Sequence, residues 1–250
     1  TLTIEKIFAF AKEVDLADVR EVLERQVRYN MAIAEEGLCG NYGANIGKVL
    51  LATYGDQDVK VRAKAMAAAG SDARMNGCEL PVVINSGSGN QGICATMPVV
   101  VFAEENHNTD EELVRALMLS HLTAIYIKQS LGVLSALCGC VVASTGSSCG
   151  ITYLMGGKYE QVSYAVKNMI ANLTGMICDG AKPSCALKLT SGVSTAVLSA
   201  MLAMQQKCVS SVEGIIDDDV DKSIHNLTSI GAEAMNETDR KVLEIMTHKS

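Results

Sequence analysis

The sequence predicts an all-α fold, a single multi-helix domain over residues 1–250 with buried apolar helices at its centre. Hydrophobic residues make up 48% of the 250 residues but aromatic residues only 4%, so small and unbranched side chains must build most of the core. Such side chains suit close helix packing better than a β-sandwich. Only 3 prolines interrupt the chain, and no segment shows the apolar–polar alternation of a half-buried strand.

Helix start signals and a helical period of apolar residues define the elements in order. Thr3 and Asp15 are predicted N-caps, and Thr109 with Glu112 three residues later matches a capping box. Residues 70–80 are expected to be irregular in part. Pro98 lies in an apolar run, at either a first helical turn or a kink. The expected helices cover 3–14, 15–36, 44–54, 58–69, 109–129, 131–143, 160–177, 190–206, 217–234 and 237–247, with a short one after 146.

Charge and cysteine content narrow the class of protein. The net charge of −7 argues against nucleic acid or an anionic membrane as the main partner. The longest nearly apolar stretches, 92–103 and 131–143, are shorter than the roughly 18 residues that span a bilayer. An odd count of 9 cysteines does not suit a secreted disulfide scaffold. We therefore expect a cytoplasmic protein whose cysteines are reduced.

Four cysteines are candidate metal ligands. Cys138 and Cys140 end the apolar run L-S-A-L-C-G-C, and Cys178 and Cys185 form a C-x6-C segment that reads as a loop between two helices. Thiolates from one loop and one helix end can converge on an iron–sulfur cluster or on zinc. Helix N-termini and Lys182 would favour the thiolate. Because this spacing is not a standard zinc or ferredoxin pattern, buried structural thiols remain an alternative.

A glycine-rich segment, N-S-G-S-G-N-Q-G at 85–92, is the clearest loop of the sequence. Its backbone N–H groups and neutral polar side chains could bind a carboxylate or a phosphate before a helix. It lacks the lysine of a P-loop, and a simple tight turn explains it equally well. Arg74 could contact a ligand or pair with Asp72. His121, in an apolar helix, could contact a ligand or be a hydrogen-bonded core residue.

Several motifs together resemble a known family. They are S-D-A-R-M-N-G, the segment from N-S-G-S-G-N-Q-G to M-P-V-V-V, R-A-L-M-L-S-H-L-T-A-I-Y-I-K, L-S-A-L-C-G-C and M-I-C-D-G-A-K-P-S-C-A-L-K. In this order they look like the C-terminal domain of the L-cysteine desulfidase family, which is related to the alpha chain of iron–sulfur L-serine dehydratase. The resemblance covers nearly the whole chain.

The resemblance implies an oxygen-sensitive [4Fe–4S] cluster held by three cysteines, with the fourth iron open to substrate. The matching positions are Cys138, Cys178 and Cys185, with Cys140 as the alternative to Cys138. The implied reaction is α,β-elimination from a small amino acid, L-cysteine or L-serine, without pyridoxal phosphate. We predict that the residues that contact the substrate are Arg74, His121, Asn85, Ser86, Gly87, Ser88, Gly89 and Asn90.

The resemblance also implies a missing part. Relatives carry an N-terminal domain with a G-C-T-E-P motif, thought to supply the base, and this chain has no such motif. We therefore expect the chain to be the C-terminal part of a longer protein, or to work with a partner chain, and we name no catalytic base in it. A homodimer is left open. The competing interpretation is a metal- or redox-sensing thiol module without catalytic activity.

Overall fold

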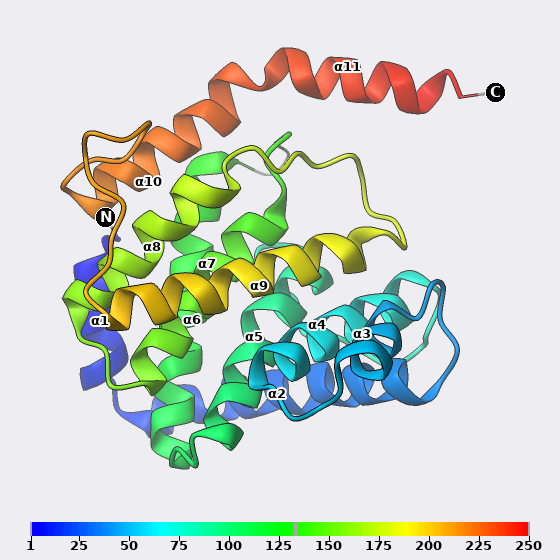
Figure 1. The fold of residues 1–250 in the computed structure, drawn as a ribbon, viewed down its shortest axis with the longest axis horizontal. Coiled ribbons are helices and arrows are strands. Elements are labelled where there is room, and N and C mark those ends of the chain that lie inside the picture. Colours follow the sequence, from blue (N-terminus) through cyan, green and yellow to red (C-terminus); the bar gives the residue numbers. More distant parts are fainter. Residues whose placement is uncertain (1, 133–134, 250) are drawn as a thin grey trace.

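The computed structural model describes residues 2–132 and 135–249, and every regular element in them is helical (Figure 1). The prediction of an all-α fold is confirmed. Two isolated β-bridges are the exceptions to helix, turn and loop in these residues. The elements are α1 (Ile4–Glu13), α2 (Leu16–Cys39), α3 (Ile46–Tyr54), α4 (Val59–Met75), α5 (Gly89–Glu105), α6 (Asp110–Leu131), α7 (Gly139–Leu154), α8 (Tyr159–Leu173), α9 (Cys185–Met204), α10 (Val220–Ser229), the π-helical turn η1 (Ile230–Ala234) and α11 (Asn236–Thr247).

Helix α7 lies at the centre of the fold and packs against α5, α6, α8 and α9 (Figure 1). Almost all of it is buried, and its sequence G-C-V-V-A-S-T-G-S-S-C-G-I-T-Y-L is dominated by small side chains. Its buried hydroxyls are hydrogen-bonded, for example Ser144 to the Cys140 carbonyl at 2.7 Å and Ser148 to the Ala196 carbonyl of α9 at 2.8 Å. Small, internally satisfied residues thus let four helices surround one.

The predicted N-caps are confirmed. The Thr3 side chain accepts a hydrogen bond from the Lys6 N–H, and the Asp15 side chain accepts one from the Ala17 N–H. Thr109 and Glu112 form the complete capping box at the start of α6. These contacts are local in sequence, which is why the sequence alone reveals them.

Two element boundaries differ from the expectation because tertiary packing overrides local signals. The stretch 70–80 is irregular in part, as expected, but only over 76–80: α4 continues through Met75, since Ile93 of α5 and Ala34 of α2 pack closely against Gly70. The expected loop 85–92 is a turn over 85–88, after which α5 begins at Gly89 and continues through Pro98.

The expected helix 131–143 is wrong. Helix α6 ends at Leu131, α7 begins only at Gly139, and residues 133–134 lie outside the described part of the chain. In residues 135–138 the backbone is not helical, because Leu137 forms an antiparallel bridge with Ile177. The short helix expected after 146 is the second half of α7.

Helix α9 is long and apolar enough to cross a membrane, with a mean hydropathy of 1.4. This helix lies outside the two longest nearly apolar stretches of the sequence, 92–103 and 131–143. In the structure α9 packs against α4, α7 and α8, and this packing explains the apolar residues on its buried face.

The ends of five helices meet at one place in the fold. Residues from the N-termini of α5, α7 and α9 line one cavity with residues from the last turns of α4 and α6. Helix α11 extends along the edge of the molecule and buries none of its residues (Figure 1).

We predict that a methyl group on the inner face of α7 destabilises the protein. A Cβ at Gly146 would lie 2.3 Å from the Ser120 carbonyl oxygen of α6, so Gly146→Ala should lower the free energy of unfolding by about 2 kcal/mol or more. Gly175→Ala is the matched control, because nothing lies within 4 Å of its added Cβ. Urea unfolding measures both, and equal midpoints would contradict the close α6–α7 contact.

Candidate functional site

The candidate site is a cavity of about 350 Å³ at the meeting point of these helix ends. Three helix N-termini contribute to its wall, and each carries the partial positive charge of unpaired N–H groups. Four cysteines line it: Cys138, Cys140, Cys178 and Cys185. The cavity thus combines soft ligand atoms with a positive local potential.

A backbone bridge brings Cys138 and Cys178 together from distant parts of the chain. The N–H of Cys138 donates to the Met176 carbonyl at 3.0 Å, and the N–H of Cys178 donates to the Ala136 carbonyl at 2.6 Å. These bonds flank the bridge between Leu137 and Ile177. The position of the two thiols therefore depends on main-chain pairing, which side-chain substitutions disturb little.

A hydrogen bond links the Cys138 and Cys178 thiols. A hydrogen bond from the Cys138 thiol lowers the pKa of Cys178, helped by the Gly180 N–H and by the nearby Lys188 and Lys128. The same hydrogen bond, together with burial, raises the pKa of Cys138. Cys178 is thus the thiolate of the pair, the form that binds metal. Lys182, which the sequence suggested for this role, instead forms an ion pair with Asp179.

Cys185 is the first residue of α9, and its sulfur lies 3.7 Å from the Gly180 carbonyl. Cys140 also lines the cavity, but its sulfur lies 3.0 Å from the Lys188 carbonyl. Its pKa is raised, first by a hydrogen bond with Cys94 and then by burial. The main-chain pairing places Cys138 beside Cys178, whereas the Cys140 sulfur is directed to the Lys188 carbonyl, and the choice of Cys138 over Cys140 as a ligand stays a prediction. In the described residues no three acidic, Cys or His side chains could hold a single metal ion.

The segment 85–88 is both a tight turn and a part of the cavity wall. The backbones of Asn85 and Ser88 exchange two hydrogen bonds of 3.1 and 3.0 Å, and the Ser88 hydroxyl caps α5 by accepting from the Gln91 N–H. Of the predicted contact residues in the segment, Ser86, Gly87, Ser88 and Asn90 line the cavity, whereas Asn85 and Gly89 do not. Gly89 instead lies against the Arg74 side chain.

Two buried amides in the first turn of α5 have no hydrogen-bond partner. Asn90 is 9% exposed and Gln91 is 6% exposed, and their side-chain oxygens are both unpaired in the described structure. Both residues line the cavity, and Gln91 packs against Gly139 at the start of α7. An unpaired buried amide costs roughly 1–3 kcal/mol, so such groups indicate a ligand that completes them.

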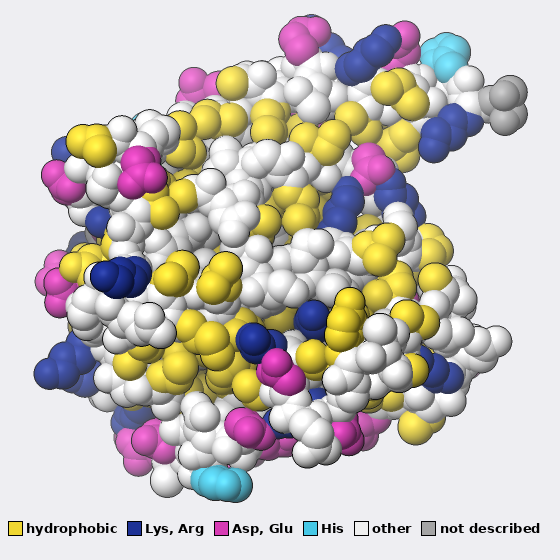
Figure 2. Space-filling view, in the orientation of Figure 1, with side chains coloured by type: hydrophobic (Ala, Val, Ile, Leu, Met, Phe, Trp, Pro, Cys, Tyr) yellow, Lys and Arg dark blue, Asp and Glu magenta, His cyan; other side chains and the backbone are white. Residues whose placement is uncertain are grey.

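The cavity also has three cationic side chains: Arg74, Lys128 and Lys188. Lys188 forms an ion pair with Asp179, as Lys182 does. Within the described residues Arg74 and Lys128 form no ion pair with a carboxylate, and Asp72 accepts a hydrogen bond from the Gly47 N–H at 3.0 Å instead of pairing with Arg74. Burial lowers the pKa of Lys128, while Cys178 and Cys138 act in the opposite direction. Figure 2 shows basic side chains gathered beneath α11, beside the loop that precedes α9. Lys128 and Gln91 were not singled out from the sequence, where each reads as an ordinary helical residue.

His121 does not line the cavity. It is buried behind the 85–92 segment, where it contacts Asn85 at 3.0 Å, Gln26 at 3.3 Å and Thr96 at 3.2 Å. Burial lowers its pKa to about 4, so the ring is neutral at physiological pH. The surroundings of His121 are therefore those of a hydrogen-bonded core residue. Direct contact of His121 with substrate stays a prediction, and this geometry does not favour it.

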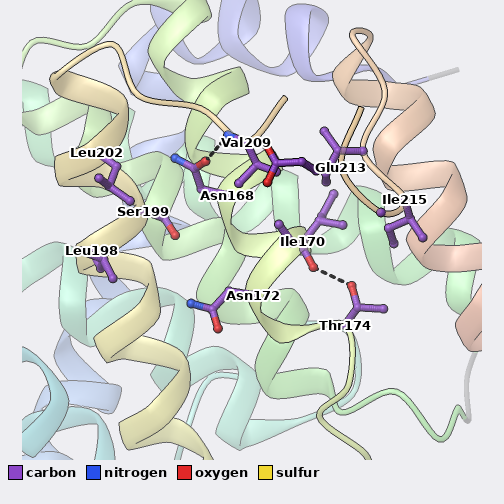
Figure 3. Close-up of a pocket in the computed structure, with 13 residues that line it drawn as sticks. Asn168, Ile170, Asn172, Thr174, Leu198, Ser199, Leu202, Val209, Glu213 and Ile215 are labelled. Atoms are coloured by element: carbon purple, nitrogen blue, oxygen red, sulfur yellow. Dashed lines mark hydrogen bonds between the residues drawn. The ribbon is translucent and has the colours of Figure 1, made fainter. Parts of the chain in front are cut away.

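A second cavity, of about 570 Å³, lies between α8, α9 and the segment before α10 (Figure 3). Its wall is mainly aliphatic, and Glu213 is the single ionisable residue among those that line it. The Asn168 amide that borders it is already paired with the Val209 N–H and the Lys207 carbonyl. This cavity lacks the thiols and cations of the first, which remains the candidate site.

Comparison with known proteins identifies the chain's relatives. The serine dehydratase alpha chain family matches residues 2–244, which confirms the resemblance noted in the sequence. UPF0597 proteins of Bacteroides thetaiotaomicron and Phocaeicola vulgatus are 66% and 64% identical to the chain over 253 residues. One from Desulfitobacterium hafniense is 47% identical over 248 residues. All three alignments cover 99% of this chain but only 57–58% of the relative, so the chain spans little more than half of their length.

We predict that His121 makes the protein less stable in acid. Its pKa of about 4 in the fold is below the usual 6.5, so the unfolded state binds the proton first and stability falls as pH drops from about 6.5 to about 4. This loss amounts to about 3 kcal/mol. His121→Gln should remove it, whereas the exposed His107→Gln controls for loss of a histidine. Urea unfolding across this pH range tests the prediction, and equal slopes in wild type and His121→Gln would contradict it.

Proposed function

Because the chain belongs to the serine dehydratase alpha chain family, we propose that it is the cluster-binding part of an iron–sulfur lyase that performs α,β-elimination on L-cysteine or L-serine. L-Cysteine would give pyruvate, ammonia and sulfide, and L-serine would give pyruvate and ammonia. The observation that carries the proposal is one cavity lined by four cysteines, the three predicted ligands among them, and by two buried amides whose side-chain oxygens have no partner among the described residues.

We propose that the thiols would hold a [4Fe–4S] cluster, as membership of the serine dehydratase alpha chain family suggests. Cys138, Cys178 and Cys185 line one wall region, yet no described group of three ligands surrounds a common point. Three ligands of a cubane bind three different iron atoms, so they need not converge on one point as zinc ligands must. Lys128 and Lys188 would balance the negative charge of the thiolates. A bound cluster with an open iron would supply a Lewis acid for the leaving hydroxyl or thiol.

The other lining residues suit an amino acid. The α5 N-terminus, with the Arg74 guanidinium beside it, offers positive charge to a carboxylate. The amides of Asn90 and Gln91 offer both acceptors and donors, and a ligand that carries an ammonium and a carboxylate can use both. These residues would orient the substrate with its side-chain heteroatom toward the thiols.

The remaining chemistry needs a proton acceptor at the α-carbon. We assign none in this chain, and we propose that it comes from the part of the longer relatives that this chain does not cover, or from a partner chain. The alternative of a metal- or redox-sensing thiol module without catalytic activity would use the same thiols, and the family match is what favours the lyase. Cytoplasmic location follows from the reduced thiols and the oxygen-sensitive cofactor, and is part of the proposal.

We predict that cluster retention depends on three of four neighbouring cysteines. After anaerobic reconstitution, Cys138→Ser, Cys178→Ser and Cys185→Ser should lose most of their iron and acid-labile sulfide, because each removes a cluster ligand. Cys140→Ser is the matched control and should retain the cluster, since its sulfur lies against the Lys188 carbonyl. Iron and sulfide assays measure the outcome. Loss in Cys140→Ser with retention in Cys138→Ser would reverse the assignment, and a wild type without iron would refute the proposal.

We also predict that Asn90→Leu separates binding from stability. The substitution removes a buried amide with an unpaired oxygen and keeps a similar volume, so the free energy of unfolding should stay unchanged or rise. Affinity of the reconstituted protein for L-serine should fall by about tenfold or more, as expected for one lost buried hydrogen bond or two. Calorimetry and urea unfolding measure the two effects. Asn172→Leu, at the second cavity, should leave the affinity unchanged. A stability loss at Asn90 without an affinity loss would mean that the amide is structural.

A further inference from the structure

A buried polar network lies directly behind the 85–92 segment and does not touch the cavity. Its centre is His121 of α6, whose Nδ1 lies 3.0 Å from Asn85 Nδ2 and 3.3 Å from Gln26 Nε2. The other ring nitrogen of His121, Nε2, lies 3.2 Å from the Thr96 hydroxyl of α5. The network thus joins α2, α5 and α6 to the turn that precedes α5.

The neighbours determine the protonation of the ring. Both groups that face Nδ1 are amide nitrogens, which can only donate, so Nδ1 must be an acceptor. In a neutral ring Nε2 then carries the hydrogen and donates it to Thr96. The Thr96 hydroxyl in turn donates to the Gly92 carbonyl at 2.7 Å. One neutral histidine therefore connects Asn85 at the start of the segment with Gly92 at its end.

A second contact fixes the chain just before the segment. The side-chain amide of Asn30, on α2, donates to the Val83 carbonyl at 3.1 Å and accepts from the Val83 N–H at 2.9 Å. It also lies 3.4 Å from the Thr96 hydroxyl. Asn30 is fully buried, so these bonds are protected from water. Hydrogen bonds thus hold the chain at three points, Val83, Asn85 and Gly92. The amides of Asn90 and Gln91 lie between the last two of these points.

We propose that His121 is a positioning residue, which acts through Asn85 and Thr96 to hold the 85–92 segment in the shape that presents Asn90 and Gln91 to the cavity. The use of that shape for an amino acid rests on the proposed function above, whereas the ordering of the segment does not. Gln26 and Asn30 support the same arrangement from α2, so a helix remote from the thiols contributes to the shape of the cavity.

Two substitutions of His121 separate its two hydrogen bonds. In His121→Asn the side-chain oxygen can replace Nδ1 as the acceptor for Asn85, whereas in His121→Gln the amide can replace Nε2 as the donor to Thr96. Both lose a ring and should be destabilised alike. We expect the protected amides of Asn85 and Ser88 to exchange about tenfold faster in His121→Gln and close to the wild-type rate in His121→Asn. Hydrogen exchange of the full chain without cluster or ligand measures this directly.

Two substitutions of Thr96 keep the test decisive if a His121 variant does not fold. Thr96→Val removes the hydroxyl and should speed exchange at the Gly92 amide, while Thr96→Ser retains the hydroxyl and should restore protection. Equal exchange in Val and Ser variants, or changes that only follow global stability, would overturn the proposal.

Binding of L-serine to the reconstituted wild type and variants completes the test. Weaker binding by about tenfold in His121→Gln and Thr96→Val, with rescue in His121→Asn and Thr96→Ser, would support positioning for the substrate. If the exchange pattern holds while wild type binds no amino acid, the segment is ordered as inferred and the proposed function fails. If wild type binds and all four variants bind equally, His121 is only structural and the inference fails.

Discussion

The small side chains of α7 are the constraint on which the rest of the structure depends. Because glycine, alanine, serine and cysteine dominate its buried faces, α5, α6, α8 and α9 can all pack against it closely. At Gly139 the start of α7 touches the Gln91 side chain of α5, where a Cβ would lie 2.7 Å from Gln91 Cδ. A bulkier central helix would separate the helix ends that now form one cavity.

The convergence of helix ends has an electrostatic consequence. The N-termini of α5, α7 and α9 lie with Arg74, Lys128 and Lys188 around one cavity. The chain as a whole has a net charge of −7. This local excess of positive potential favours thiolates over thiols and attracts a carboxylate. The pKa of Cys178 is lowered first by its hydrogen bond with Cys138 and then by Gly180, Lys188 and Lys128, whereas a hydrogen bond with Cys94 and burial raise the pKa of Cys140. The fold and the local charge thus both favour the binding of an anion in this cavity.

The sequence predicted what depends on local contacts or residue type, and missed what depends on distant partners. Thr3 and Thr109 cap helices through bonds to residues three positions away, so their roles are visible without a structure. The bridge between Leu137 and Ile177 links distant segments, and for that reason the expected helix 131–143 was wrong. Lys128 and Gln91 look like ordinary helical residues until α6, α7 and α9 are placed around them. The cysteine assignments remain predictions that the cavity supports.

The central claim is that this cavity holds a cluster whose one open iron meets an amino acid. Mössbauer spectroscopy of the iron-57-reconstituted chain, recorded with and without L-serine, tests it most directly. We expect a [4Fe–4S] spectrum in which one iron site changes on addition of L-serine and three do not. A chain that binds no iron as a cubane, or a cluster whose four sites ignore the amino acid, would contradict it.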